Sequence, residues 1–149
     1  MDRLIQRLAK TGVIGIDTPV FIYHLEAHPQ YFPLTLEILS NMEKGKWTGV
    51  TSAITLMEIN VHPWRLGRED IARKYETLLV NFPHLSIVSV DRDVARIASQ
   101  LRARFGVHPP DALQVAATLM AGARLFLTND QRLSNLQSLI DVVVLDDYL

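Results

Sequence analysis

Short apolar runs alternate with amphipathic segments along the chain. The apolar runs hold four to six residues, are rich in valine, isoleucine and leucine, and are typical of buried strands. The segments between them place apolar side chains three and four residues apart, as amphipathic helices do. Five strands are predicted, at residues 13–16, 47–51, 85–90, 125–128 and 142–145. Helices are predicted at residues 1–10, 18–27, 34–44, 52–61, 68–80, 92–101 and 111–121, followed by a short one that starts at 129–130.

Several predicted helices carry boundary signals. Asp17 can cap the helix that follows the first strand, and Pro19 suits its first turn. Thr51 or Ser52 can cap another helix, and we expect Pro63 to end it, because proline removes a backbone donor and clashes with the preceding turn. Because strands alternate with helices, the chain is predicted to be an α/β protein with a mostly parallel sheet. In such sheets ligands bind beyond the carboxyl ends of the strands.

Four acidic residues stand out by their positions. Asp17 and Asp130 each come just after a predicted strand. Asp111 opens a predicted helix, and Glu58 lies inside a mostly apolar one. Each also has a simpler interpretation, because aspartates cap helices and suit their first turns, and His62 could pair with Glu58.

Taken together, the four carboxylates indicate a metal site. Carboxylates that converge at one edge of a sheet repel each other unless cations join them. Oxygen ligands suit hard cations such as Mg²⁺ and Mn²⁺. Such an ion lowers the pKa of a bound water and neutralises charge on a phosphoryl group. The pattern therefore favours a centre that cleaves phosphodiester bonds.

The composition of the chain limits the kinds of partner that it can bind. The chain has 149 residues, with 15 lysines and arginines against 16 acidic residues and a net charge of −1, so nothing draws it as a whole to nucleic acid or to an anionic membrane. Any contact with nucleic acid has to come from a local patch or through bound metal. Without cysteine there is no disulfide or thiolate zinc site. No apolar run approaches the roughly 18 residues of a membrane helix, so we expect no membrane partner and a cytoplasmic location.

Basic side chains that could bind the phosphates of a nucleic acid gather in three places. Arg65 and Arg68 lie next to Trp64, and Lys44 and Lys46 lie next to Trp47. Arg102 and Arg104 form the third group. Basic side chains bind phosphates and aromatic rings stack on bases, so these groups could contact substrate. The alternative is an ordinary solvated rim.

Other patterns carry less chemistry. His24 and His28 have the spacing of helical zinc ligands, but the glutamate that zincins place directly after the first histidine is missing. No glycine-rich phosphate loop or nucleophile elbow occurs. The apolar stretches 54–61 and 71–80 exceed what one small core needs, which indicates an interface.

Four sequence blocks resemble those of the PIN domain family, and most closely its VapC-like ribonuclease toxins from toxin–antitoxin pairs. The blocks are IDTPVFI at 16–22, TSAITLMEI at 51–59, PDALQVA at 110–116 and LTNDQRL at 127–133. No single block is specific. All four in this order, in this context of strands and helices, are specific together.

The resemblance implies roles for the acidic residues. The family's catalytic and metal-binding quartet falls on Asp17, Glu58, Asp111 and Asp130. Its hydroxyl residue before the last acid falls on Thr128, which would hydrogen-bond within the cluster. The implied cofactor is Mg²⁺ or Mn²⁺, and the implied reaction is hydrolysis of RNA to a 3′-hydroxyl and a 5′-phosphate.

The resemblance also implies architecture and partners. We expect a PIN-like three-layer α/β/α sandwich with a mostly parallel central sheet, as one domain over residues 1–149 with a helical extension at 1–11. Relatives form homodimers and bind a small antitoxin, so the expected function is that of a ribonuclease toxin of a type II toxin–antitoxin pair. The alternatives are a PIN nuclease in RNA or DNA processing and a non-catalytic PIN-fold binding module.

Overall fold

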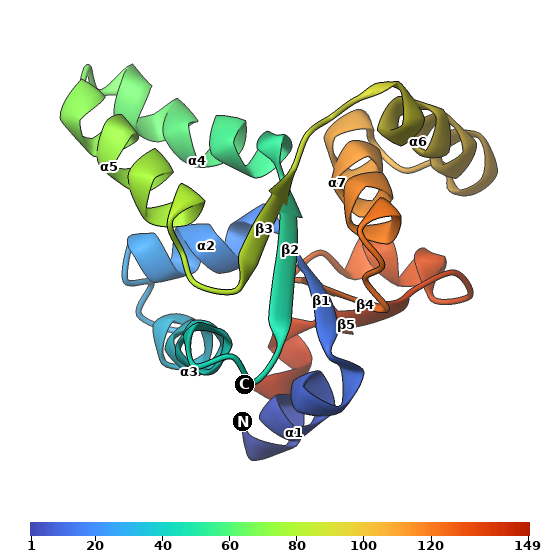
Figure 1. The fold of residues 1–149 in the computed structure, drawn as a ribbon, viewed down its shortest axis with the longest axis horizontal. Helices are drawn as coiled ribbons and strands as arrows, with labels where there is room; N and C mark the ends of the chain where they lie inside the picture. Colours follow the sequence, from blue (N-terminus) through green and yellow to red (C-terminus); the bar gives the residue numbers. More distant parts are fainter.

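A five-stranded sheet lies at the centre of the structure, a computed structural model that describes residues 1–149 (Figure 1). All neighbouring strands are parallel, in the order β3–β2–β1–β4–β5. The strands are β1 (Val13–Ile16), β2 (Thr48–Ser52), β3 (Leu85–Val88), β4 (Leu125–Thr128) and β5 (Asp141–Val144). The predicted strands and the predicted parallel sheet are confirmed.

Helices cover both faces of this sheet. They are α1 (Asp2–Thr11), α2 (Thr18–Leu25), α3 (Phe32–Glu43), α4 (Ala53–Arg65), α5 (Glu69–Val80), α6 (Arg92–Phe105) and α7 (Pro109–Met120), with the 3₁₀ helices η1 (Gln131–Leu136) and η2 (Leu145–Tyr148). Helices α2 to α5 lie on one side of the sheet and α6 and α7 on the other (Figure 1). This is the three-layer α/β/α arrangement that the family resemblance implies, and it is confirmed. None of the helices has the length and hydrophobicity of a membrane span.

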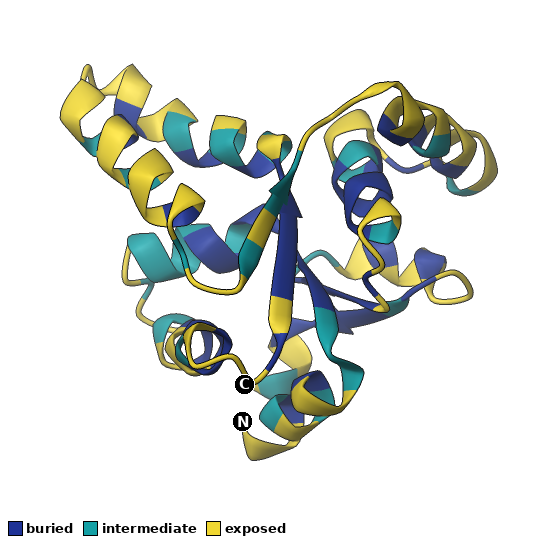
Figure 2. Cartoon of the chain, in the orientation of Figure 1, coloured by how far each residue is buried: buried dark blue, intermediate teal, exposed yellow.

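The side chains of the strands contribute to two separate hydrophobic cores, one on each face of the sheet. Successive side chains of a strand point to opposite faces, so Leu125 and Leu127 enter the core under α2, α3 and α5, whereas Phe126 enters the core under α6 and α7. All three side chains are fully buried. Figure 2 shows β1, β2, β4 and β5 as mostly buried, whereas the edge strand β3 is intermediate to exposed. Burial on both faces explains why β1, β4 and β5 are nearly continuous apolar runs.

Gly15 allows α7 to approach the sheet closely. A Cβ atom at residue 15 would lie 2.9 Å from Cβ of Thr118 and 3.0 Å from Cδ1 of Phe126. Real Cβ atoms essentially never come within 3.0 Å of another side chain, so a larger residue would push α7 away from β1. The glycine therefore sets the position of the helix that carries Asp111.

The prediction that Pro63 ends its helix is wrong. Helix α4 continues to Arg65, with Pro63 buried inside it. The loss is small because the proline lies in the last turn, where only its own missing N–H fails to bond. The following backbone is bonded normally, with the N–H of Leu66 donating to the carbonyl of His62 at 3.1 Å.

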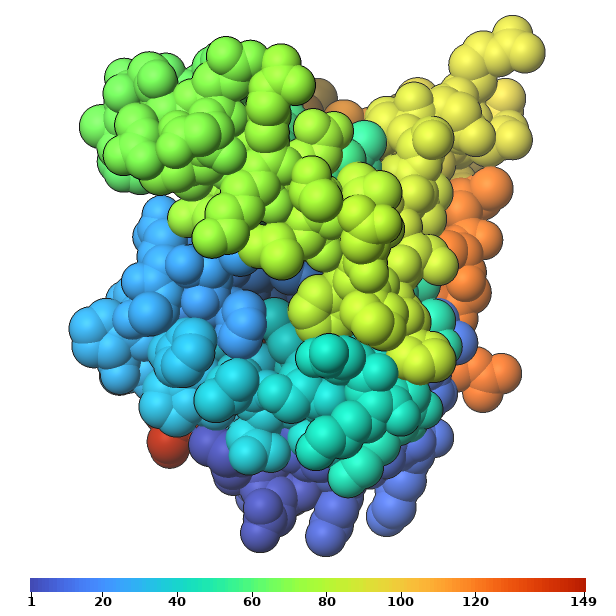
Figure 3. Space-filling model, turned by 60° about the vertical axis from the view of Figure 1, so that its left-hand side comes forward, coloured from blue at the N-terminus to red at the C-terminus, as the bar shows by residue number.

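The outer side of α4 and its junction with α5 expose large apolar side chains. Met57, Val61 and Trp64 are 40 to 56% exposed, and together with Leu56 they line a cavity of about 570 Å³. We call these four residues the α4 surface. Figure 3 shows the α4–α5 pair (green) projecting from the body of the molecule.

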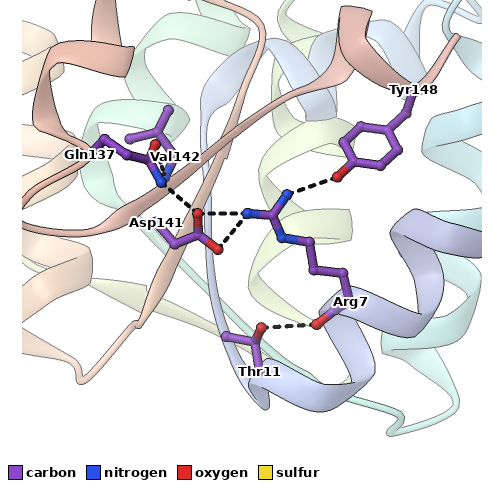
Figure 4. A network of polar contacts seen from close by, with 6 residues as sticks. All are labelled: Arg7, Thr11, Gln137, Asp141, Val142 and Tyr148. Atoms are coloured by element: carbon purple, nitrogen blue, oxygen red, sulfur yellow. Dashed lines mark hydrogen bonds and ion pairs between the residues drawn. The ribbon is translucent and has the colours of Figure 1, made fainter.

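A polar clamp holds helix α1 against the other end of the chain (Figure 4). Arg7 donates from Nη2 to both carboxylate oxygens of Asp141 at 2.7 Å and from Nη1 to the hydroxyl of Tyr148 at 2.8 Å. On the inner side of α1, Leu4 and Leu8 are fully buried in the core. The predicted N-terminal helix is therefore confirmed, and it packs at the amino ends of the strands.

Candidate active site

Four carboxylates line one cavity of about 340 Å³ at the carboxyl edge of the sheet. They belong to Asp17, Glu58, Asp111 and Asp130, and the remaining lining residues are Thr18, Pro19, Ile22, Val61 and Arg132. Asp17 and Asp130 arrive there because they follow β1 and β4, which are neighbours in the sheet. Glu58 comes from α4 and Asp111 from the first turn of α7. Thus four residues far apart in the sequence share one cavity.

Asp17 is the most deeply buried of the four, at 5% exposure. Its Oδ1 accepts the backbone N–H of Thr18 at 2.9 Å, and its Oδ2 accepts the hydroxyl of Thr128 at 2.7 Å. Burial is the main cause that raises the pKa of Asp17 to about 6, and the nearby charges of Asp111 and Glu58 also raise it, whereas the hydrogen bonds from Thr128 and Thr18 lower it. The carboxylate of Asp17 is thus fixed in orientation, and no basic side chain near it compensates its negative charge.

Glu58 is held by a hydroxyl and not by a cation. The Thr18 hydroxyl donates to Oε1 of Glu58 at 2.7 Å. No ion pair joins Glu58 to His62, which is exposed on the same helix. The open alternative of a histidine partner is therefore not the one that the structure adopts.

A buried polar network supports Thr18 from below. Gln114, on α7 and 1% exposed, donates from Nε2 to the hydroxyl of Thr55 at 2.7 Å and to that of Thr18 at 3.3 Å. Its Oε1 accepts the hydroxyl of Ser52, the residue that caps α4. Thr55 also contacts the Thr51 hydroxyl at 2.7 Å. The network ties α2, α4, α7 and β2 together directly beneath Glu58.

Asp111 lies half-buried between Asp130 and two basic side chains. Burial is the main cause that raises the pKa of Asp111, and the charge of Asp130 adds to it. Arg132 and His108 act in the opposite direction. The positive groups on this side of the cavity do not fully offset the carboxylates.

Asp130 carries the cavity's one ion pair. Arg132 donates from Nε to Oδ1 at 3.0 Å and from Nη2 to Oδ2 at 2.7 Å, and its backbone N–H also donates to Oδ1 at 3.0 Å. These bonds to Arg132 are the main reason that the pKa of Asp130 is lowered. Sequence reasoning missed Arg132, whose position two residues after a capping aspartate was the available signal.

A family model described as PIN domain matches residues 14–139, most of the chain. The chain belongs to the PIN domain family. A search among curated proteins finds no match.

Solved structures share the fold of this PIN domain at low sequence identity. VapBC2 from Rickettsia felis, bound to a DNA fragment from its promoter, superposes with a TM-score of 0.67 at 16% identity, over 89% of this chain and 98% of that one. A toxin–antitoxin complex from Klebsiella pneumoniae gives 0.62 at 20% identity, over 89% and 96%. DNA-bound VapBC from Salmonella typhimurium gives 0.60 at 19% identity, over 89% and 97%.

The basic residues expected to contact substrate do not line the carboxylate cavity of this PIN domain. Arg65 lines the cavity of the α4 surface, and Arg68 is exposed and paired with Asp70 at 2.9 Å. Arg102 donates to a backbone carbonyl at 3.1 Å, and Arg104 lies over a phenylalanine ring at 5.0 Å. Any contact that these arginines make with substrate lies outside the cavity itself.

The two histidines at zinc-like spacing have other surroundings. The ring of His24 stacks on Phe32 at 5.2 Å between centroids, and burial lowers the pKa of His24. His28 accepts the backbone N–H groups of Gln30 and Tyr31 through Nδ1. Local hydrogen bonding thus accounts for His28, whereas His24 is held by stacking alone and its Nδ1 is buried without a hydrogen-bond partner.

The carboxylate cavity offers the right donor chemistry for a hard divalent cation. Its donors are carboxylate and hydroxyl oxygens, and the excess of negative charge helps to raise the pKa of Asp17 and of Asp111. In the arrangement described here, no three Asp, Glu or His side chains approach closely enough to hold an ion. The residue types therefore fit a cation, and Asp130 is engaged with Arg132 in its place.

The buried charge of Asp17 predicts an unusual pH dependence of stability. The folded-state pKa of about 6 lies above the ordinary value of 3.8, so the folded protein binds the proton more tightly than the unfolded chain. With metal chelated, the contribution of Asp17 to the free energy of unfolding is expected to fall by about 2 kcal/mol as the pH rises from about 4 to about 7. Urea denaturation at several pH values in EDTA measures this. The unaltered chain is compared with Asp17→Asn, because the lowered pKa of His24 makes stability rise with pH in both proteins. A stability difference between the two that does not change across this window would contradict the burial of an uncompensated Asp17.

Proposed function

We propose that this PIN domain is a divalent-metal-dependent endoribonuclease that acts as the toxin of a type II toxin–antitoxin pair. The observation that supports it is the convergence of four carboxylates, from two strand ends and two helices, in one cavity of a PIN fold. Such a concentration of negative charge is costly unless a cation compensates it. RNA brings phosphate oxygens, which are the remaining ligands that Mg²⁺ prefers.

The side chains divide the work of this proposed reaction. When bound, Mg²⁺ or Mn²⁺ would supply an acidified water and neutralise charge on the phosphoryl group. Asp17, Asp111 and Asp130 would hold the cation, and Glu58 would bind it or orient the attacking water. Thr128 fixes the Asp17 carboxylate through its 2.7 Å hydrogen bond. A carboxylate held in this way needs little reorganisation during the reaction.

The proposed partners are a second copy of the chain and a small antitoxin. The similar structures from Klebsiella pneumoniae and Rickettsia felis are described as a toxin–antitoxin complex and as VapBC2. The α4 surface exposes apolar side chains beside the carboxylate cavity, and Val61 lines both cavities. An inhibitor that covers this surface would therefore also reach the entrance to the carboxylates.

Incubation of the purified chain with mixed single-stranded RNAs tests the proposed activity. Cleavage is expected with Mg²⁺ or Mn²⁺, and EDTA is expected to abolish it. Products are expected to carry a 5′-phosphate, which a phosphate-dependent exonuclease detects. Cleavage that persists in EDTA would exclude a metal-dependent reaction at this site, and cleavage of DNA alone would favour a role in DNA processing.

A non-catalytic binding module is the second candidate. One observation favours it: Asp17 and Asp130 do accept backbone N–H groups as helix caps, and Asp130 is already paired with Arg132. Titration calorimetry with Mn²⁺ separates the two functions. A nuclease centre is expected to bind the ion, whereas a module with purely structural carboxylates is expected to bind none.

A further inference from the structure

Arg132 is the one lysine or arginine that lines the carboxylate cavity. It also lines a second, smaller cavity of about 70 Å³, together with His108 and Asn135. Asp111 and Asp130 are shared by both cavities, so the two adjoin. Arg132 therefore lies between the carboxylate cavity and a smaller cavity that has an imidazole and an amide beside the two shared carboxylates.

The guanidinium of Arg132 bonds the Asp130 carboxylate but remains exposed to solvent. Nε and Nη2 bond both oxygens of Asp130, while Nη1 makes no hydrogen bond. The Arg132 side chain is 70% exposed, against 25% for Asp130. An exposed ion pair of this kind contributes little stability and exchanges readily. The same carboxylate oxygens are those that a divalent cation would need.

Charge counting explains why the arginine sits there. Four carboxylates and a single guanidinium line the cavity, so Arg132 supplies its only fixed positive charge. A guanidinium and a divalent cation cannot both take the inner oxygens of Asp130 without strong repulsion. If Arg132 left Asp130, the N–H donors of its planar guanidinium would be free beside the second cavity. A guanidinium can bind two oxygens of a phosphate group at once.

We propose that Arg132 is the internal counterion of Asp130 in the metal-free site and becomes a ligand for an RNA backbone phosphate once a divalent cation has taken that carboxylate. This inference rests on the proposed function, since it assumes a cation site at the four acids. In this inference, the smaller cavity, lined by His108 and Asn135, binds the phosphate next to the one that is cleaved.

Binding of Mn²⁺ tests the counterion role without any cleavage. In titrations followed by electron paramagnetic resonance, Arg132→Gln is expected to bind Mn²⁺ about tenfold more tightly than the unaltered chain, because no guanidinium competes for Asp130. Arg73→Gln is the matched control, since Arg73 makes a similar contact with Glu69 on the distant helix α5. An unchanged or weaker Mn²⁺ affinity of Arg132→Gln would overturn the counterion role.

Binding of RNA tests the phosphate role. The probe is a fluorescein-labelled, single-stranded 2′-O-methyl RNA, measured by anisotropy with Mn²⁺ between about 50 and 200 mM salt. Loss of one phosphate contact is expected to reduce the slope of log K against log salt by about 0.7 in Arg132→Gln. Arg132→Lys keeps the charge and is expected to keep the slope. A slope in Arg132→Gln equal to that of Arg73→Gln would overturn the phosphate role.

The two experiments separate this inference from the proposed function. If the unaltered chain binds Mn²⁺ and Arg132→Gln binds it with the same affinity, the cation site stands and only the role of Arg132 is wrong. If the unaltered chain binds no Mn²⁺, both the cation site and the exchange at Asp130 are wrong.

Discussion

Replacement of Asp17 by asparagine is expected to lower the rate of RNA cleavage by about 10³-fold. Asparagine keeps the size of the side chain but removes the charge that would hold a cation, and several kcal/mol of transition-state stabilisation depend on that charge. The amide can still cap α2 through its oxygen. Initial rates at saturating Mg²⁺, compared between the variant and the unaltered chain, measure the loss.

The same substitution is expected to stabilise the fold. Asp17 is charged at pH 7.5 although burial raises its pKa to about 6, so its removal is expected to increase the free energy of unfolding in EDTA by about 2 kcal/mol. Asp91→Asn is the matched control, because Asp91 also caps a helix, through the N–H of Val94, and does not line the carboxylate cavity. It is expected to change neither rate nor stability appreciably. A destabilised Asp17→Asn with full activity would mean that Asp17 is only a helix cap.

Replacement of Gln114 by leucine is expected to cost about 4 kcal/mol of stability. Leucine has a similar volume but no polar atoms, so the hydroxyl of Ser52 loses its acceptor and those of Thr55 and Thr18 lose a donor. Each buried polar group left without a partner costs about 1 to 3 kcal/mol. Urea denaturation measures the loss.

The activity of the Gln114 variant reports on Glu58. Without Gln114, the Thr18 hydroxyl that bonds Glu58 loses its support. Cleavage measured at a temperature where the variant is still folded is therefore expected to fall in kcat with little change in KM. Gln100→Leu, on the exposed side of α6, is the control for an added leucine and is expected to behave like the unaltered chain. Equal stability of the two leucine variants would show that the network contributes nothing.

The pattern of apolar and polar residues predicts the elements well because burial on both faces makes β1, β4 and β5 nearly continuous apolar runs. It also identifies the four acids, because a carboxylate just after such a run, or inside an apolar helix, is conspicuous. The meeting of Asp17 with Asp130 depends on the pairing of β1 with β4, which joins segments more than a hundred residues apart. Local patterns carry no information on which strands become neighbours.

Sequence reasoning missed Gln114 and Arg132 for different reasons. In the sequence, Gln114 is only one polar residue in a predicted helix. Its role depends on hydrogen bonds to three hydroxyl groups on other elements. Arg132 makes a local contact, because it lies two residues after the aspartate that caps η1, but nothing in the sequence shows that its guanidinium turns back onto Asp130. Pro63 misled the prediction of the end of α4 because the penalty for a proline is small in a final turn.

The clamp of Arg7 on Asp141 and Tyr148 has a practical consequence. It fixes the first helix beside the start of β5, whereas the four acids lie beyond the opposite ends of the strands. In Figure 1 both chain termini lie together on this far side. A biotin attached to residue 1 would anchor the molecule to a surface with its carboxylates facing the solution. Single molecules could thus be tethered and still meet polynucleotides freely.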